Sequence, residues 1–292
     1  MSIFKTSATL LLALAIGAPA IFAQWPDYPT PGPRTKEGKV DLAAPPPRTA
    51  DGKPDFSGLW EPARGAGGRG GRGGGQSMNG TLPLPFAIPT SPDDPPVGQF
   101  FNIGAGFKDG LLPFTPWAAQ VRAARKGDNN KDNPDALCEP LGLTQLHMHP
   151  QPRKIVQTPR EIIVLYEANG NTRQILTDGR GLPNNNPTPW WYGYSVGHWD
   201  GDTLVVETTG FRDDVWLDVE GSPLTSTGKM TERWRRLKFG LMQIDITIED
   251  PKAYTKPFTV RVNHQLMPDT ALMEFVCEER DAVHYVGPSG KK

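Results

Sequence analysis

The sequence lacks the short motifs by which many enzymes can be recognised. It has no phosphate-binding P-loop, no G-x-S-x-G nucleophile elbow and no H-E-x-x-H zinc motif. An excess of one charge is also missing, since 31 basic residues stand against 32 acidic ones. The two signs are interspersed, so no basic stretch indicates a nucleic-acid partner.

Long apolar runs are missing beyond the N-terminus. Lys5 precedes an apolar run over 9–16 that is too short to span a bilayer, and small residues then allow cleavage after Ala20 or Ala23. We predict a signal peptide over 1–23 and a periplasmic or secreted protein with no integral membrane span. An uncleaved N-terminal anchor is the alternative.

Cysteine is scarce, with Cys138 and Cys277 as the two present, and no C-x-x-C pair exists. In an oxidising compartment an even pair is typical of a single disulfide. We therefore predict a bond between Cys138 and Cys277, with two buried free thiols as the alternative.

Turn-forming residues are abundant and divide the chain by composition, with 32 glycines and 31 prolines. Residues 24–54 are rich in proline and are expected to form an extended arm that adds little to the core. A single β-rich domain is predicted over 55–286, with a Gly/Pro-rich loop at 64–99. Residues 287–292 are expected to be a disordered tail.

An alternation of apolar and polar residues begins at Arg153 and predicts a series of antiparallel strands. One short helix precedes it, with Thr115 as its cap and 117–125 as its body. Asn169-Gly170 and Asp200-Gly201 are expected to form two-residue hairpin turns. The predicted strands are 154–157, 161–167, 172–177, 192–199, 203–209, 231–237, 241–249, 258–266 and 271–278.

Strands joined by short turns form a meander, and a meander this long leaves open edges unless it closes. We therefore expect a mostly all-β fold, an antiparallel up-and-down meander that closes into a barrel and can enclose one small ligand. Gly58-Leu59-Trp60 resembles the G-x-W motif that opens the first strand of lipocalins, which implies a lipocalin-like barrel. A two-sheet β-sandwich is the alternative.

Five sequence blocks resemble those of a family of uncharacterised, exported, β-rich bacterial proteins. The blocks are DGKPDFSGLW (51–60), CEPLG (138–142), PRKIVQTPREIIVLYE (152–167), GHWDGDTLVVETTGF (197–211) and EDPKAYTKPF (249–258). The likeness covers most of the chain after the signal segment. It implies an exported β-rich domain and brings no activity with it.

The hairpin over 192–209 supplies most of the candidate site residues. In the expected register Tyr192, Tyr194 and His198 lie on one face. Glu207 lies on the same face, directly opposite Tyr194. An enclosed carboxylate beside a phenol could bind a ligand hydroxyl or act as a base. A solvated outer face with ordinary cross-strand pairs is the alternative.

Two further pairs of residues are candidates. Tyr166 is expected opposite Arg173, where the guanidinium could bind a carboxylate or phosphate of a ligand or could simply stack on the ring. His147 and His149 form an H-x-H that, if extended, would direct both imidazoles to one side as weak candidate metal ligands. More often such histidines bond to backbone, and we predict no metal and no cofactor.

These features favour an exported, soluble β-barrel protein that binds a small aromatic or anionic ligand. One alternative is an acid–base enzyme on the same scaffold, an isomerase, lyase or hydrolase with Glu207, Tyr194 and His147 as candidate catalytic residues. Another is a structural protein associated with the cell envelope. The sequence identifies neither the ligand nor the oligomeric state.

Overall fold

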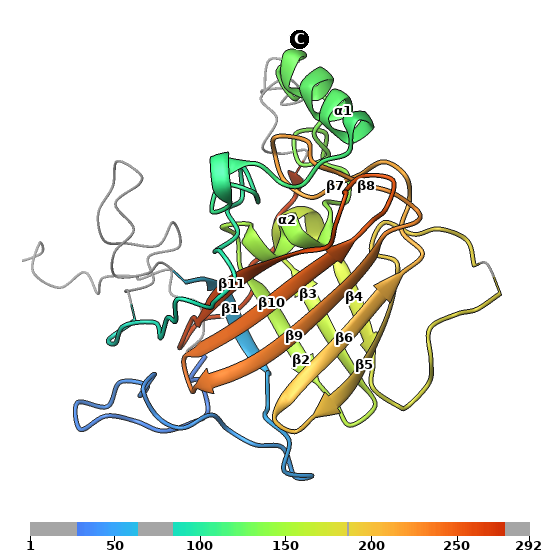
Figure 1. Ribbon diagram of the computed structural model, residues 1–292. Helices are drawn as coiled ribbons and strands as arrows, with labels where there is room; N and C mark the ends of the chain where they lie inside the picture. Colours follow the sequence, from blue (N-terminus) through green and yellow to red (C-terminus); the bar gives the residue numbers. More distant parts are fainter. Residues whose placement is uncertain (1–27, 64–83, 186, 278–292) are drawn as a thin grey trace, which may run out of the picture.

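The computed structural model describes residues 28–63, 84–185 and 187–277 (Figure 1). Within these ranges nine strands close into a barrel. The expected fold, a mostly β chain closing into a barrel, is confirmed, and the sandwich alternative is wrong. The described helices are all too short or too polar to cross a membrane.

Around the barrel the strands follow the order β1, β11, β10, β9, β6, β5, β4, β3, β2. Two short strands, β7 (Val215–Trp216) and β8 (Pro223–Leu224), pair with each other outside this ring. The barrel strands are β1 (Gly58–Pro62), β2 (Arg153–Gln157), β3 (Glu161–Tyr166), β4 (Thr172–Leu176), β5 (Tyr194–Asp200), β6 (Thr203–Thr209), β9 (Lys229–Lys238), β10 (Leu241–Glu249) and β11 (Phe258–Leu266).

Strands β4 and β5 depart from the expected meander because they run parallel. They share two residue pairs, Ile175 with Ser195 and Leu176 with Val196. Parallel neighbours need a long connection, and residues 177–185 and 187–193 leave the barrel wall before β5 begins (yellow loop at the right of Figure 1). The antiparallel ladder is therefore interrupted at this one place in the described barrel.

The long strands bury one face and leave the other partly exposed to solvent, as the alternation of apolar and polar residues predicted. Asp245 and Thr247 on β10 are partly exposed. The side chains between and beside them, Met242, Ile244, Ile246 and Ile248, are almost inaccessible to solvent. Phe56 lies just before β1 and packs edge-on against Trp234 of β9. This contact joins the residues before β1 to the barrel core.

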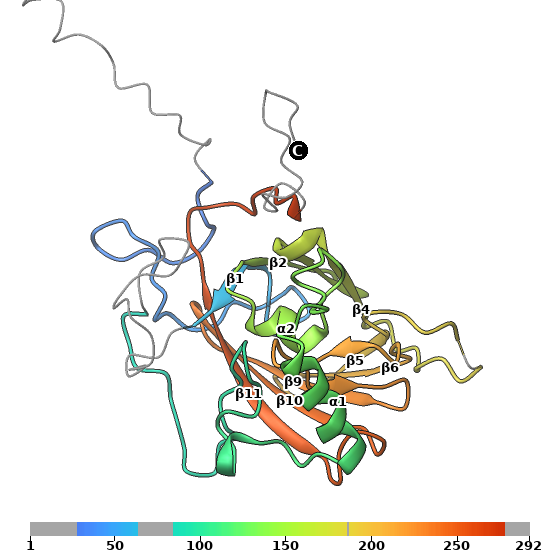
Figure 2. The same ribbon diagram turned by 90° about the horizontal axis from the view of Figure 1, so that it is seen from above.

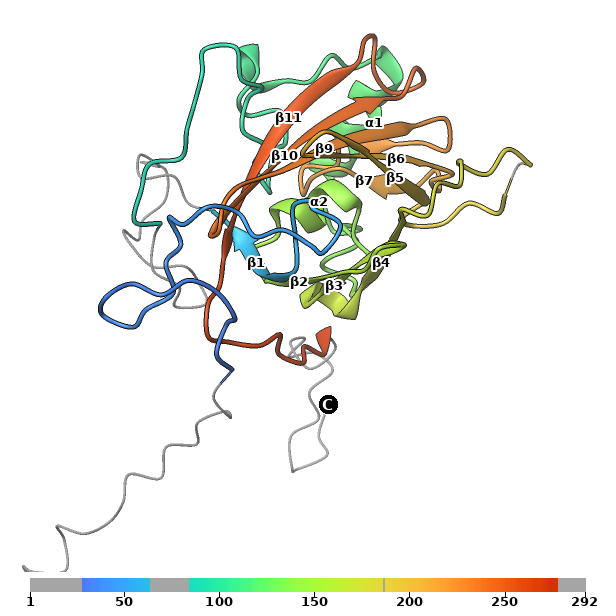
Figure 3. The same cartoon turned by 90° about the horizontal axis from the view of Figure 1, so that it is seen from below.

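Helix α2 (Leu143–Met148) lies inside the barrel. Figures 2 and 3 show it between the strands β1–β4 and the strands β5–β11, and all six of its residues are buried. The residue before the helix packs closely against the backbone of Trp216, since a Cβ on Gly142 would lie 2.1 Å from the carbonyl oxygen of Trp216. The end of the helix follows from Pro150, because a proline disfavours helical geometry at the preceding residue.

The other helix, α1 (Pro116–Gly127), lies beyond one end of the barrel (Figure 1) and confirms the predicted helix. Thr115 caps it, with its Oγ1 accepting a hydrogen bond from Ala118 N at 3.2 Å. Two single 3-10 turns complete the helical elements described, η1 (Lys108–Gly110) and η2 (Ala168–Gly170).

Over its described residues, 28–54, the proline-rich arm contains no helix and no regular strand, but it forms two hydrogen-bonded loops rather than one extended segment. It packs along the barrel end that carries the β5–β6 and β9–β10 turns (blue in Figure 1). Phe239 N and Gly240 N, in the β9–β10 turn, donate to Ala44 O and Leu42 O at 2.8 and 2.9 Å. Val40 is buried and belongs to the hydrophobic core. The arm therefore contributes to the core, contrary to the expectation from composition. We call residues 28–57 the strap.

The predicted last strand is wrong, since residues 271–276 form no strand. The edge of β11 that it would have occupied is taken by β1, with Trp60 opposite Leu266. The predicted disulfide is confirmed. Cys138 and Cys277 are bonded, and their Cα atoms are 5.5 Å apart, within the usual range.

Candidate functional site

The registers of the β3–β4 and β5–β6 hairpins are both shifted by two residues from the expected ones. Tyr194 lies opposite Thr209, and Glu207 lies opposite Val196, because the turn is centred on Gly201 and Asp202. Arg173 likewise lies opposite Val164 and not opposite Tyr166, because the loop after β3 is longer than two residues. A shift of two keeps each side chain on its predicted face.

The face that carries Tyr194 and Glu207 is turned outward. The enclosed carboxylate considered for Glu207 is therefore wrong, and the alternative, a solvated outer face, is observed. The Glu207 side chain is 32% exposed and forms an ion pair with Lys229 at 2.6 Å. His198 is exposed. Tyr194 stacks on Trp190, with ring centroids 4.5 Å apart. Glu207 and His198 therefore do not meet the other candidates.

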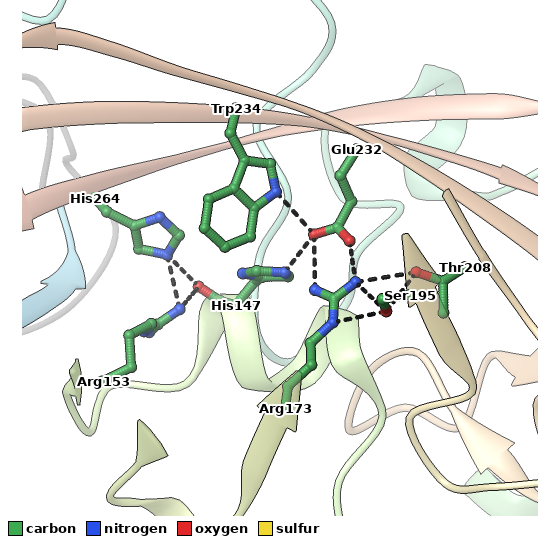
Figure 4. A network of polar contacts seen from close by, with 8 residues as sticks. All are labelled: His147, Arg153, Arg173, Ser195, Thr208, Glu232, Trp234 and His264. Carbon is green, nitrogen blue, oxygen red and sulfur yellow. Dashed lines mark hydrogen bonds and ion pairs between the residues drawn. The ribbon is translucent and has the colours of Figure 1, made fainter. Parts of the chain in front are cut away.

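The interior instead holds a buried polar cluster centred on an ion pair between Glu232 of β9 and Arg173 of β4 (Figure 4). The guanidinium contacts both carboxylate oxygens and donates to the hydroxyls of Ser195 and Thr208 at 3.0–3.2 Å. Burial alone would raise the pKa of Glu232, but Arg173 and His147 hold it below its usual range. Glu232 is thus ionised at neutral pH and neutralises Arg173.

His147 of α2 contacts the same carboxylate, with its Nε2 2.7 Å from Glu232 Oε1. Burial lowers the pKa of His147 despite the attraction of Glu232, so the ring is neutral at pH 7. Because the carboxylate accepts, Nε2 carries the hydrogen and Nδ1 is a free base. Nδ1 is buried and has no hydrogen-bond partner among the described residues. A carboxylate that fixes the tautomer of an imidazole in this way is the arrangement found in catalytic dyads.

Arg153 of β2 contacts the same, C-terminal end of α2. It donates to the carbonyl oxygens of His147 and His149 at 2.8 and 3.1 Å, where a cation also opposes the negative end of the helix dipole. His264 Nε2 lies 2.8 Å from both Arg153 Nη1 and His147 O. Burial lowers the pKa of Arg153 to about 10 and that of His264 well below its normal value. Strands β2, β9 and β11 thus fix α2 through polar contacts.

We expect stability to fall as pH drops from 7 to 5. The pKa values of His147 and His264 are lowered in the folded protein, whereas the unfolded chain takes up protons near pH 6.5. The unfolded state then binds more protons, so the free energy of unfolding decreases by up to about 1.4 kcal/mol per pH unit for each histidine. Urea denaturation at stepped pH measures this slope. His264→Gln should remove about half of it, and an unchanged slope in that variant would refute the assignment.

His147 and His149 do not form the metal site considered from sequence. His147 lies in a helix, and His149 lies beyond its end with Phe100 against its ring. His149 Nδ1 accepts from Gln151 N at 3.1 Å. Within the described ranges, no group of three or more His, Cys, Asp or Glu residues could hold a metal ion.

A groove of about 450 Å³ lies in the barrel wall beside the parallel pair of β4 and β5. Trp190, Tyr192 and Tyr194 contribute its aromatic lining. Arg173 and Ser195, both buried members of the polar cluster, also line it, so the groove reaches the cluster. Of the residues predicted to bind a ligand, Arg173, Tyr192 and Tyr194 meet here.

Tyr192 and Tyr166 differ in their relation to this groove. The Tyr192 hydroxyl is buried without a hydrogen-bond partner among the described residues, and burial raises its pKa. Tyr166 is buried on β3, close enough to Arg173 and Arg153 for both to oppose the rise in pKa that burial causes. Tyr166 belongs to the interior cluster and does not line the groove.

Glu232, Arg153, Trp234 and His264 were not predicted as site residues. A signal for Glu232 exists in the sequence, because Met230, Glu232 and Trp234 share one face of a strand by their spacing. A carboxylate on an otherwise apolar face indicates a buried partner. No comparable signal marks Arg153, whose contacts depend on where α2 ends.

Comparison with protein-family models, with curated proteins and with solved structures finds no match to this chain.

Proposed function

We propose that the protein binds a small aromatic molecule, carrying a hydroxyl or carboxylate, in the groove between β4 and β5. The observation that carries the proposal is the Tyr192 hydroxyl, buried in the groove lining without a partner among the described residues. Leaving such a group unpaired costs about 1–3 kcal/mol. A polar substituent on a bound ligand would satisfy it.

The lining of the groove supports this ligand class. A volume of about 450 Å³ lies in the range of small-molecule sites. Trp190 is 54% exposed and offers a ring face at the entrance. Ser195 and Arg173 of the polar cluster form part of the buried side of the groove. An aromatic ring with one polar end is complementary to both parts.

Tyr192→Phe should weaken binding of 4-hydroxybenzoate about tenfold, the value of one hydrogen bond of roughly 1.4 kcal/mol. The free protein should stay as stable as wild type, because the substitution removes an unsatisfied buried hydroxyl. Calorimetric titration measures the affinity. Tyr28→Phe is the matched control, since Tyr28 lies on the strap, and it should bind as wild type. Equal affinity in Tyr192→Phe, or no binding of 4-hydroxybenzoate to the wild type, would overturn the proposal.

Acid–base catalysis is a second candidate, favoured by the pair of Glu232 and His147 with its free Nδ1. His147 is 1% exposed, so a substrate would have to reach it from the groove past Arg173. Diethyl pyrocarbonate, which acylates neutral imidazole nitrogens, tests this access. Modification of His147 in the folded protein, located by peptide mass, supports the candidate. Protection of His147 until the protein unfolds removes it.

A further inference from the structure

The strap contains an internal repeat. Residues 33–42 (PRTKEGKVDL) and 47–56 (PRTADGKPDF) are identical at six of ten positions. Each unit forms the same loop, in which the threonine amide donates to the lysine carbonyl four residues later, at 2.7 and 2.8 Å. Gly38 and Gly52 both have φ near 80°, a conformation that favours glycine. The two units are therefore copies in structure as well as in sequence.

Each repeat unit is attached to the barrel by its arginine. Arg34 donates to both oxygens of Asp269, just beyond β11, at 3.1 Å. Arg48 donates to both oxygens of Asp202, in the β5–β6 turn, at 2.9 and 2.5 Å. Both pairs are solvent-exposed, and such pairs contribute only about 0–1 kcal/mol each. These two ion pairs can open while the barrel stays folded, and the strap then remains attached in its middle through Val40 and the backbone hydrogen bonds of Leu42 and Ala44.

A partly open cavity of about 620 Å³ lies between the strap and the barrel end. Several prolines of the strap form one side, among them Pro31, Pro33, Pro45 and Pro47. Leu59, Leu266 and Met267 form much of the other side, and Ala271 and Leu272 complete it. The lining is thus largely apolar and large enough for a small molecule.

Two cations face this cavity. Arg236 is 5% exposed and donates to the carbonyl oxygens of Asp55, Ser57 and Phe239, without an ion pair to any described carboxylate. Lys154 is exposed and likewise has no ion pair within the described ranges. Asp55 is the only acid among the described lining residues, and its Oδ1 already accepts from Ser57 N at 2.8 Å. The cavity is therefore complementary to an anion.

We propose that this cavity binds a small carboxylate with an aliphatic body and that the strap is its lid. The aliphatic body would lie against Leu59, Leu266 and Met267. The carboxylate would approach Lys154 and Arg236. Four of the five N–H groups of Arg236 donate to backbone carbonyls, so one remains for the ligand. This site is independent of the groove between β4 and β5.

Octanoate is a suitable probe, and 1-octanol is its uncharged match. Lys154→Met should weaken octanoate binding about tenfold, as loss of one charge-assisted contact implies, and should leave 1-octanol binding unchanged.

Ala271→Trp should fill the cavity and abolish binding of both octanoate and 1-octanol. Replacing Arg34 and Arg48 together by Gln should raise the dissociation rate of octanoate severalfold, because the lid opens more often. Calorimetry and stopped-flow measurements give these quantities.

Two controls separate this site from other surfaces. Lys256→Met removes an exposed lysine at the opposite end of β11, and Tyr192→Phe alters the groove. Octanoate affinity should be unchanged in both. The proposal fails if octanoate does not bind, or if it binds equally well to wild type and Lys154→Met. It also fails if Tyr192→Phe weakens octanoate binding instead.

Discussion

Replacing Glu232 with alanine should lower the free energy of unfolding by about 3–5 kcal/mol, the usual cost of removing one partner of a buried ion pair. The loss is large because Arg173 would remain charged and inaccessible to solvent, with no carboxylate beside it. His147 and Trp234 would lose their acceptor in the same step. Urea denaturation followed by tryptophan fluorescence measures the change.

Glu207→Ala is the matched control, since it removes a glutamate whose pair with Lys229 is partly exposed. Its cost should stay below about 1 kcal/mol. Glu232→Gln should fall between the two, because the amide oxygen can still accept while the charge is lost. A cost for Glu232→Ala no larger than that of Glu207→Ala would show that the cluster does not hold α2 in place.

Reducing the disulfide between Cys138 and Cys277 should lower the free energy of unfolding by about 4–5 kcal/mol, the chain-entropy estimate for so long a loop. The two cysteines are 139 residues apart and enclose most of the barrel strands. The bond therefore restricts the unfolded chain far more than a short loop would. Denaturation with and without a reductant measures the difference.

The double replacement of Cys138 and Cys277 by alanine is the companion to this experiment. Its stability should match that of the reduced wild-type protein and should not respond to reductant. If reduction cost less than about 1 kcal/mol, the chain-entropy account would not apply to this loop.

Most barrel strands could be predicted because apolar and polar residues alternate along them, as they do from Met242 to Glu249. The parallel pair could not, because residues 177–193 carry no period that indicates on which side the chain returns. The strand predicted at 271–278 failed for a related reason. A local pattern cannot show that the edge of β11 is already occupied by β1, which comes from the other end of the chain.

The alternation assigns each side chain of the central hairpin to the correct face, but it does not show which face turns inward. The face that turns inward carries the small residues Ser195 and Gly197, which leave space beside them. The space beside Ser195 is in fact filled by the Arg173 guanidinium, and that beside Trp199 by Phe56, stacked at 5.9 Å. Both partners lie far away in sequence, so the hairpin alone could not reveal them.

The pairing of β1 with β11 also governs when this barrel can fold. Trp60 meets Leu266, so the ring stays open until nearly the whole described chain is present. Until β11 pairs with β1, each of these two strands exposes an unpaired edge, and such edges promote association between chains. Topologies that join distant segments also fold slowly. We therefore expect aggregation of the open sheet to compete with closure of the barrel during folding.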